Sequence, residues 1–140
     1  MIMDDVKSLA KMTHVEIIDF VIAHFKEQKA IAKTYSGSGV FGGCFYRLNK
    51  DEKTIACAVG CLMPDSIYSA SFENKSVHDL VDSLKDFLEH ERKNCLDTHN
   101  FLRFVEKKED FLSSLQELHD ESDSLEEFIE NLYVLREQYV

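Results

Sequence analysis

The stretch "GGCFYRLNKDEKTIACAVGCLMPD", residues 42–65, decides how this chain folds. It contains three of the four cysteines, three of the five glycines and the only proline of the chain. Two apolar, strand-like runs flank the polar residues "NKDE" at residues 49–52, a common loop length for a β-hairpin. We therefore predict an antiparallel hairpin with strands at residues 40–48 and 53–62.

A four-residue loop would fix the pairing of the two strands. Cys44 would then lie opposite Cys57, and Tyr46 opposite Ile55. Both faces of such a hairpin would be apolar, whereas a hairpin with one face in water alternates apolar and polar residues. We therefore expect helices to cover both faces of the hairpin.

Helical patterns begin on either side of the hairpin. Thr13 followed by Glu16 is the pattern of a capping box, and apolar residues then recur at helical spacing to about Lys33. Proline is tolerated in the first turn of a helix, so Pro64 predicts a short helix over residues 64–72.

The second half of the chain is predicted to form a series of helices. Caps at Ser76, Asp97 and Ser124 open three helical stripes, and the polar run "EKKED" at residues 106–110 interrupts the second of them. The expected fold is a single α+β domain over residues 1–140, mostly helical, with about five helices packed around one hairpin.

Composition indicates a cytoplasmic globular protein. The 140 residues are 44% apolar and 30% charged, which suits one domain with its own core. No apolar run approaches the roughly 18 residues of a membrane span, and the early acidic residues do not fit a signal peptide. We expect reduced thiols, a cytoplasmic location and no membrane partner.

The net charge of −10 lies entirely in the second half of the chain. Residues 1–72 have eight acidic and eight basic side chains, whereas residues 73–140 have eighteen acidic and eight basic ones. The densest stretch, "ELHDESDSLEEFIE" at residues 117–130, has seven acidic side chains and no lysine or arginine. Such a surface repels nucleic acids and favours basic partners. It is either a solvated helix face or a protein-binding surface, with Glu126 and Glu127 as candidate contacts.

The thiols admit three interpretations. Cys44 and Cys57, if paired across the hairpin, could share a metal ion, although two ligands are only half of a structural zinc site. Cys57 and Cys61 would converge only if the chain turns helical there. A nucleophilic cysteine needs a base, for which His119 beside Asp120 is the best candidate. Packing of buried cysteine as a small apolar residue is the commonest case. We expect no cofactor.

Three short motifs stand out: "GGCFYR" at residues 42–47, "IACAVGCLMPDSIY" at residues 55–68 and "LQELHD" at residues 115–120. They resemble motifs of a family of small proteins found mainly in bacteriophages and prophages. The resemblance implies an accessory protein in the cytoplasm of the host cell, where it binds and disables a host or defence protein. It transfers no catalytic residue.

The motifs also group several polar residues. Arg47 is the one charged residue in its strand-like run, and if buried it needs a carboxylate, for which Asp65 and Asp120 are candidates. Together with Tyr46 and Tyr68, these residues either tie the hairpin to the helices or line a polar pocket for a small ligand.

The leading functional hypothesis is a non-enzymatic, phage-type accessory protein that binds a host protein through its acidic surface. One alternative is a small hydrolase or metal protein built on Cys44, Cys57 and His119. A further alternative is a module that sequesters a small signalling ligand near Arg47.

Overall fold

The computed structural model describes residues 2–35, 41–44, 46–50, 53–90 and 96–140. Within these residues the α-helices are α1 (Val6–Lys11), α2 (His14–Gln28), α3 (Val77–His90), α4 (Leu96–Lys107), α5 (Glu109–Glu121) and α6 (Leu125–Glu137). The strands are β1 (Lys33–Tyr35), β2 (Phe41–Cys44), β3 (Arg47–Lys50) and β4 (Lys53–Ala56), and two 3-10 turns are η1 (Gly60–Leu62) and η2 (Ala70–Phe72). The predicted fold class, a mostly helical α+β domain, is confirmed.

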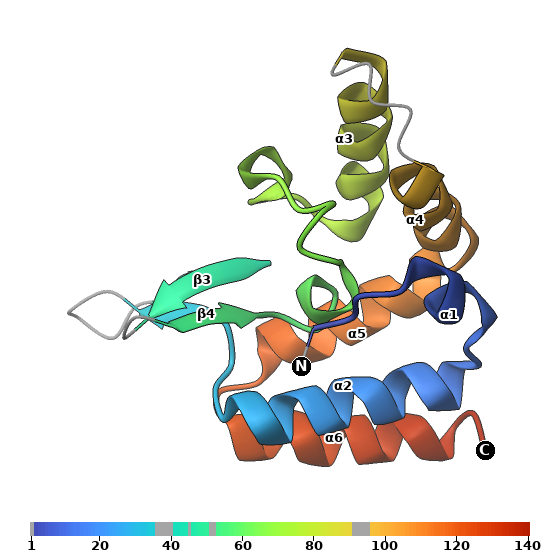
Figure 1. The fold of residues 1–140 in the computed structure, drawn as a ribbon. Helices are drawn as coiled ribbons and strands as arrows, with labels where there is room; N and C mark the ends of the chain where they lie inside the picture. Colours follow the sequence, from blue (N-terminus) through green and yellow to red (C-terminus); the bar gives the residue numbers. More distant parts are fainter. Residues whose placement is uncertain (1, 36–40, 45, 51–52, 91–95) are drawn as a thin grey trace.

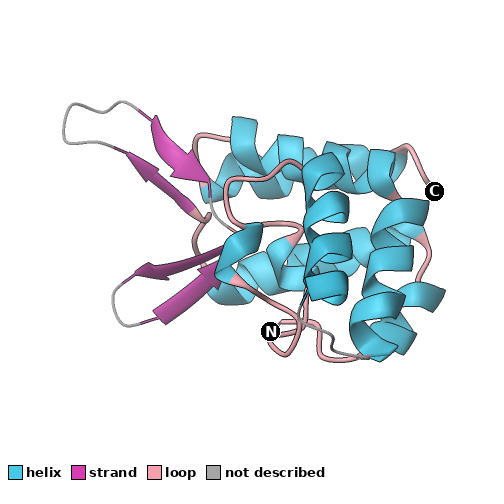
Figure 2. Ribbon diagram, turned by 90° about the horizontal axis from the view of Figure 1, so that it is seen from above, coloured by secondary structure: helices cyan, strands magenta, loops and turns pink. Residues whose placement is uncertain are grey.

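The helices pack in a continuous series, and the strands project from one side of the helical body (Figures 1 and 2). α2 packs on α6, α6 on α5, α5 on α3, α3 on α4 and α4 on α1. The contact between α2 and α6 includes an ion pair in which Arg136 Nε lies 2.7 Å from Asp19 Oδ1. Among the described residues, none of the helices combines the length and the apolar character that crossing a bilayer requires.

Three of the predicted helix caps are confirmed. Thr13, Ser76 and Ser124 each accept a hydrogen bond from the backbone N–H three residues later, at 3.2, 3.1 and 3.1 Å. The capping box at Thr13 is complete, because its own N–H donates back to the Glu16 carboxylate at 3.0 Å. The cap at Asp97 is wrong, since α4 begins at Leu96 and places Asp97 in its first turn.

Two predicted helix extents are also wrong. α2 ends at Gln28, short of Lys33, because Lys29 adopts a left-handed conformation with φ of 60°. Residues 64–72 form a turn and η2 instead of an α-helix. Here Ser69 is extended and its hydroxyl accepts from a nearby backbone N–H at 3.3 Å, a local bond that competes with helix formation.

The strand-like runs pair differently from the prediction. β3 pairs with β4, so Arg47 lies opposite Ala56. β2 pairs with β1, which the sequence did not reveal, and Cys44 lies opposite Lys33. The predicted pairing of Cys44 with Cys57, and of Tyr46 with Ile55, is therefore wrong.

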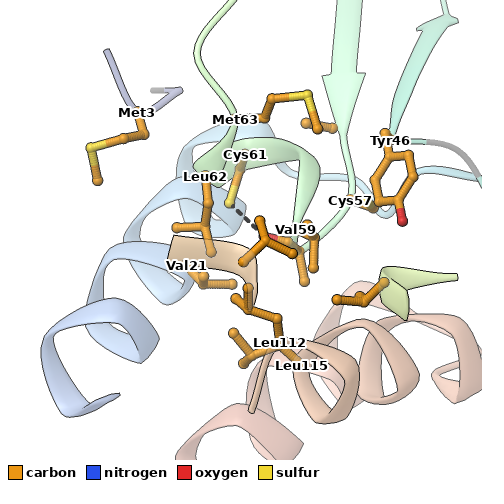
Figure 3. Close-up of a cluster of buried hydrophobic side chains, with 14 of the residues drawn as sticks. Met3, Val21, Tyr46, Cys57, Val59, Cys61, Leu62, Met63, Leu112 and Leu115 are labelled. Carbon is orange, nitrogen blue, oxygen red and sulfur yellow. Dashed lines mark hydrogen bonds between the residues drawn. The ribbon is translucent and has the colours of Figure 1, made fainter. Parts of the chain in front are cut away.

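The chain leaves the β3–β4 hairpin after Ala56, and residues 56–63 are called the core segment below. All eight of its residues are buried. The chain turns helically here, and Cys61 N–H donates to Cys57 O at 2.9 Å. In Figure 3 the side chains of this segment lie among Val21 of α2 and Leu112 and Leu115 of α5.

The expectation that helices cover both faces of the hairpin is therefore wrong for the β3–β4 hairpin. It applies only to the core segment that follows it. Ile55, near the base of the β3–β4 hairpin, is buried, whereas Asn49, Lys53 and Thr54 toward the tip of the hairpin are exposed. The reason is that most apolar residues of the predicted second strand, residues 53–62, belong to the buried core segment.

Candidate functional site

Two glutamine side chains bind the backbone of the core segment. Gln28, the last residue of α2, accepts from Ala56 N–H at 2.8 Å and donates to Ala56 O at 2.9 Å. Gln116 of α5 accepts from Val59 N–H at 3.2 Å. Buried backbone groups need such partners because no water reaches them. These contacts join the core segment to two helices.

Arg47, at the start of β3, is also bound to the core segment. Its guanidinium donates to the carbonyls of Gly60, at 3.2 Å, and Met63, and it forms an ion pair with Asp65. It also lies over the ring of Tyr68, 5.2 Å from the ring centroid. The Arg47 side chain is 7% exposed and that of Asp65 is 78% exposed. The predicted contact between Arg47 and Asp65 is confirmed.

Glu73 completes this junction, and no pattern in the sequence marks it. Its carboxylate accepts the backbone N–H groups of Tyr46, at 2.8 Å, and Arg47, at 3.0 Å. It also accepts the Tyr68 hydroxyl at 2.6 Å. The pKa of Tyr68 is raised to about 12, mainly by burial and secondly by the hydrogen bond to Glu73. This hydroxyl is therefore protonated at neutral pH. The Tyr46 hydroxyl donates to Lys75 O at 2.7 Å.

These contacts favour the structural interpretation of the Arg47 junction over a ligand pocket. Asp65, Tyr68 and Glu73 are all engaged with Arg47 or with its backbone. In the described part of the chain, Arg47 Nε is the one buried side-chain nitrogen or oxygen without a hydrogen-bond partner. The sequence placed Asp120 as a second candidate partner, but Asp120 accepts from Gln116 Nε2 at 2.8 Å instead.

His119 is buried and connects α5 to the chain beyond α2. Its Nε2 accepts from Ala32 N–H at 3.0 Å, which leaves the ring proton on Nδ1, 3.1 Å from Asp120 Oδ1. The ring packs against Phe25 and Phe128, with centroid distances of 5.7 and 5.3 Å. A general base needs its lone pair directed at a substrate, and here the lone pair of Nε2 is used by the backbone.

Cys57 and Cys61, the cysteines whose side chains the structure describes, are packed in the core. Cys57 Sγ accepts from Gly60 N–H at 3.3 Å, and Cys61 Sγ donates to Ala58 O at 3.1 Å, the dashed line in Figure 3. Burial raises the pKa of both thiols above the ordinary value. Nucleophilic attack and metal binding both require the thiolate, which burial disfavours. With Cys44 not paired to Cys57, the predicted two-cysteine metal site and the hydrolase built on it lose their geometric basis.

Two clusters on α3 have ligand atoms within 4.8 Å of one another, as a metal site would require: His78, Asp79 and Asp82, and Asp86, Glu89 and His90. All six side chains are exposed. His78 Nδ1 lies 2.7 Å from Glu109 Oε1, and this hydrogen bond raises the pKa of His78. Exposed carboxylates one turn apart are ordinary on an acidic helix, so the clusters by themselves assign no metal.

A groove between α5 and α6, here called the acidic groove, includes Glu117, Leu118 and Glu121 of the acidic stretch at residues 117–130. Its volume is about 270 Å³, and it is lined by Ser114, Glu117, Leu118, Glu121, Asn131, Val134, Leu135 and Gln138. Apolar side chains are accessible here: Val134 is 63% exposed, and Leu118 and Leu135 are half-buried. The groove therefore combines carboxylates with an apolar surface.

Glu126 and Glu127, the predicted contacts, are exposed in the first turn of α6 and do not line the acidic groove. Glu127 has a structural role as well, because its carboxylate accepts Asp123 N–H at 3.0 Å while its own N–H donates to Ser124. Carboxylates at this position stabilise a helix N-terminus.

The fold and its surface features define a small, mostly helical α+β protein with a buried core segment. No protein-family model matches the chain, and neither the curated proteins nor the solved structures yield a match.

Proposed function

We propose that this protein acts by binding a basic segment of another protein in the acidic groove, without catalysing a reaction. The partner is a host-cell protein, as the phage-type motifs imply. The observation that supports the proposal is the coincidence of exposed carboxylates and exposed apolar side chains in one groove.

The lining residues have the spacing that accepts a third helix. Residues 114, 117, 118 and 121 form one stripe along α5, and residues 131, 134, 135 and 138 form one stripe along α6. An amphipathic helix can place its apolar side chains between two such stripes, which is a common mode of peptide recognition. Carboxylates at the groove select a helix whose polar face carries lysine or arginine.

The net charge supports the same partner chemistry. The chain carries −10 overall, and Glu117, Glu121, Asp123, Glu126, Glu127 and Glu130 of the densest stretch are all exposed. A negative field of this kind accelerates encounter with a positive partner, and the acceleration falls as salt rises. Acidic side chains outside the groove thus contribute to association even without direct contact.

The experiment is affinity capture from bacterial lysate with the wild type and two double variants. Both variants change the net charge by the same amount. Glu117→Lys with Glu121→Lys reverses two carboxylates of the acidic groove, and Asp82→Lys with Glu89→Lys reverses two exposed carboxylates of α3. Glu127 is left intact because it caps α6. We expect the wild type and the α3 variant to capture the same protein, and the groove variant to lose it.

Val134→Asp tests the apolar part of the groove separately, since it places a carboxylate where the proposal requires an apolar contact. It should also abolish capture while leaving the melting temperature close to that of the wild type, because Val134 is exposed. The proposal fails if no protein is captured by the wild type, or if both groove variants capture the same protein as the wild type.

A further inference from the structure

A second cleft, between α1 and α4, has a charge opposite to that of the whole molecule. Its volume is about 340 Å³. Five of its lining side chains are basic: Lys7 and Lys11 from α1, Arg103 and Lys107 from α4, and Lys108 directly after α4. None of the lining residues is acidic. In a chain with 16 basic and 26 acidic side chains, this concentration of positive charge is local and specific.

The arrangement follows from helical spacing. Lys7 and Lys11 are four residues apart, as are Arg103 and Lys107, so each helix presents two cations along one face. Between these pairs the cleft is lined by apolar side chains, Val6, Ala10 and Phe104. Val6 and Phe104 are buried, whereas Ala10 is exposed and leaves room above the floor.

Carboxylates lie near this cleft without pairing closely with its cations. Asp5 interacts electrostatically with Lys7, and Lys107 and Lys108 also line a neighbouring pocket with Glu106, Glu109 and Asp110. Across the described ranges, none of the five basic side chains lies within 4.0 Å of a carboxylate oxygen. Lysines in the last turn of a helix interact favourably with its dipole, which accounts for Lys11 and Lys107. Lys7 and Arg103 lie earlier in their helices, so the dipole does not account for them. Burial, and then the charge of Lys107, lowers the pKa of Lys108.

We propose that the α1–α4 cleft binds a small organic phosphate that carries two or more negative charges on an apolar or aromatic body. Five cations around one small cavity favour a multiply charged anion, and the guanidinium of Arg103 can donate two parallel hydrogen bonds to a phosphoryl group. The apolar floor provides a surface for the body of the ligand.

The dimensions of the cleft favour a small molecule over a macromolecule. α1 has six residues and is therefore about 9 Å long, too short to support a partner helix of several turns or a nucleic acid duplex. A cavity of about 340 Å³ lies within the range of small-molecule sites. This site is formed by different helices from the acidic groove, so either proposal can fail without the other.

The test is isothermal titration calorimetry of the full chain with ATP, pyrophosphate and adenosine, in magnesium-free buffer. ATP has both the charge and the aromatic body, pyrophosphate has only the charge, and adenosine has only the body. We expect ATP to bind more tightly than pyrophosphate, adenosine to show no measurable binding, and the ATP affinity to fall as salt is raised.

The variant Lys7→Ala with Arg103→Ala removes one cation from each side of the cleft. Its matched control, Lys53→Ala with Lys85→Ala, changes the net charge equally at exposed positions of β4 and α3. Hydrogen bonds to charged groups contribute enough that the cleft variant should bind ATP about tenfold or more weakly. The control should bind like the wild type, and the melting temperatures of both variants verify that they are folded.

Three results would overturn the proposal: no detectable ATP binding by the wild type, an equal loss of affinity in the cleft variant and its control, or equal affinities for ATP and pyrophosphate. The last result would show that the apolar floor takes no part in binding.

Discussion

Arg47, a residue of the first motif, binds the core segment through its side chain. Its guanidinium reaches two carbonyls of the core segment and one carboxylate, but these partners differ in environment. Gly60 and Met63 are buried, whereas Asp65 is largely exposed. Exposed ion pairs contribute little to stability, while buried carbonyls without donors are costly. The carbonyl contacts therefore dominate.

A pair of substitutions separates the two contributions. Arg47→Ala leaves the carbonyls of Gly60 and Met63 without their donor and should lower the free energy of unfolding by about 2–4 kcal/mol. Asp65→Asn removes only the exposed charge and should cost less than about 1 kcal/mol. Urea unfolding measures both. Equal costs would mean that the ion pair, not the carbonyl contacts, holds the junction.

Residue-level contacts were partly predictable. Arg47 with Asp65 could be inferred because a lone charge in an apolar run needs a partner nearby. Glu73, Gln28 and Gln116 could not, because each binds backbone groups of a segment distant in sequence, and no periodic pattern marks a side chain with that role.

At the scale of elements, the caps were predictable and the strand pairing was not. Serine and threonine caps bond within one turn, so sequence spacing alone specifies them. The register of β3 and β4 differs from the prediction by two residues, and a shift of two keeps every side chain on the same face. Alternation of apolar residues therefore cannot distinguish the two registers. The six-residue α1 and the strand β1 were missed because both are too short to show a period.

The turn that carries the chain from β4 into the core depends on one glycine. A Cβ added to Gly60 would lie 2.1 Å from Tyr46 O, a backbone atom that cannot move without displacing β3. Gly60→Ala should therefore lower the free energy of unfolding by about 3 kcal/mol or more.

The control for this substitution is Ser66→Ala, at an exposed position shortly after the core segment, which should change stability by about 0.5 kcal/mol or less. Chemical denaturation of both variants gives the comparison. A Gly60→Ala protein as stable as the control would show that the close approach of Gly60 to β3 is not required.

Over the whole molecule, acidic and basic side chains are found at different clefts: carboxylates at the acidic groove, and lysines and an arginine at the α1–α4 cleft. The acidic surface of α5 and α6 could be anticipated from the run of carboxylates at residues 117–130, but the groove could not, because the predicted contacts Glu126 and Glu127 lie outside it. The basic cleft could not, because its cations come from α1 and α4, about ninety residues apart in the chain, and only their packing brings them together. A chain with a net charge of −10 thus has one surface suited to basic partners and one suited to anions.

The core segment, which belongs to the second motif, lies inside this molecule among side chains of α2 and α5 (Figure 3). The core segment contains Cys57 and Cys61, both buried and hydrogen-bonded to their own turn. We propose that these core residues build the fold and that binding occurs on the helical surface. If so, the thiols react only when the protein unfolds.

Iodoacetamide labelling of the native protein, resolved for each cysteine by mass spectrometry, tests this claim most directly. Ser66→Cys, at an exposed position, provides a reference thiol in the same chain. We expect the reference thiol to be labelled rapidly while Cys57 and Cys61 stay unlabelled, even above the ordinary thiol pKa, until denaturant unfolds the protein. Labelling of Cys57 in the native protein at a rate close to that of the reference would contradict this expectation and would restore a reactive thiol as the functional group.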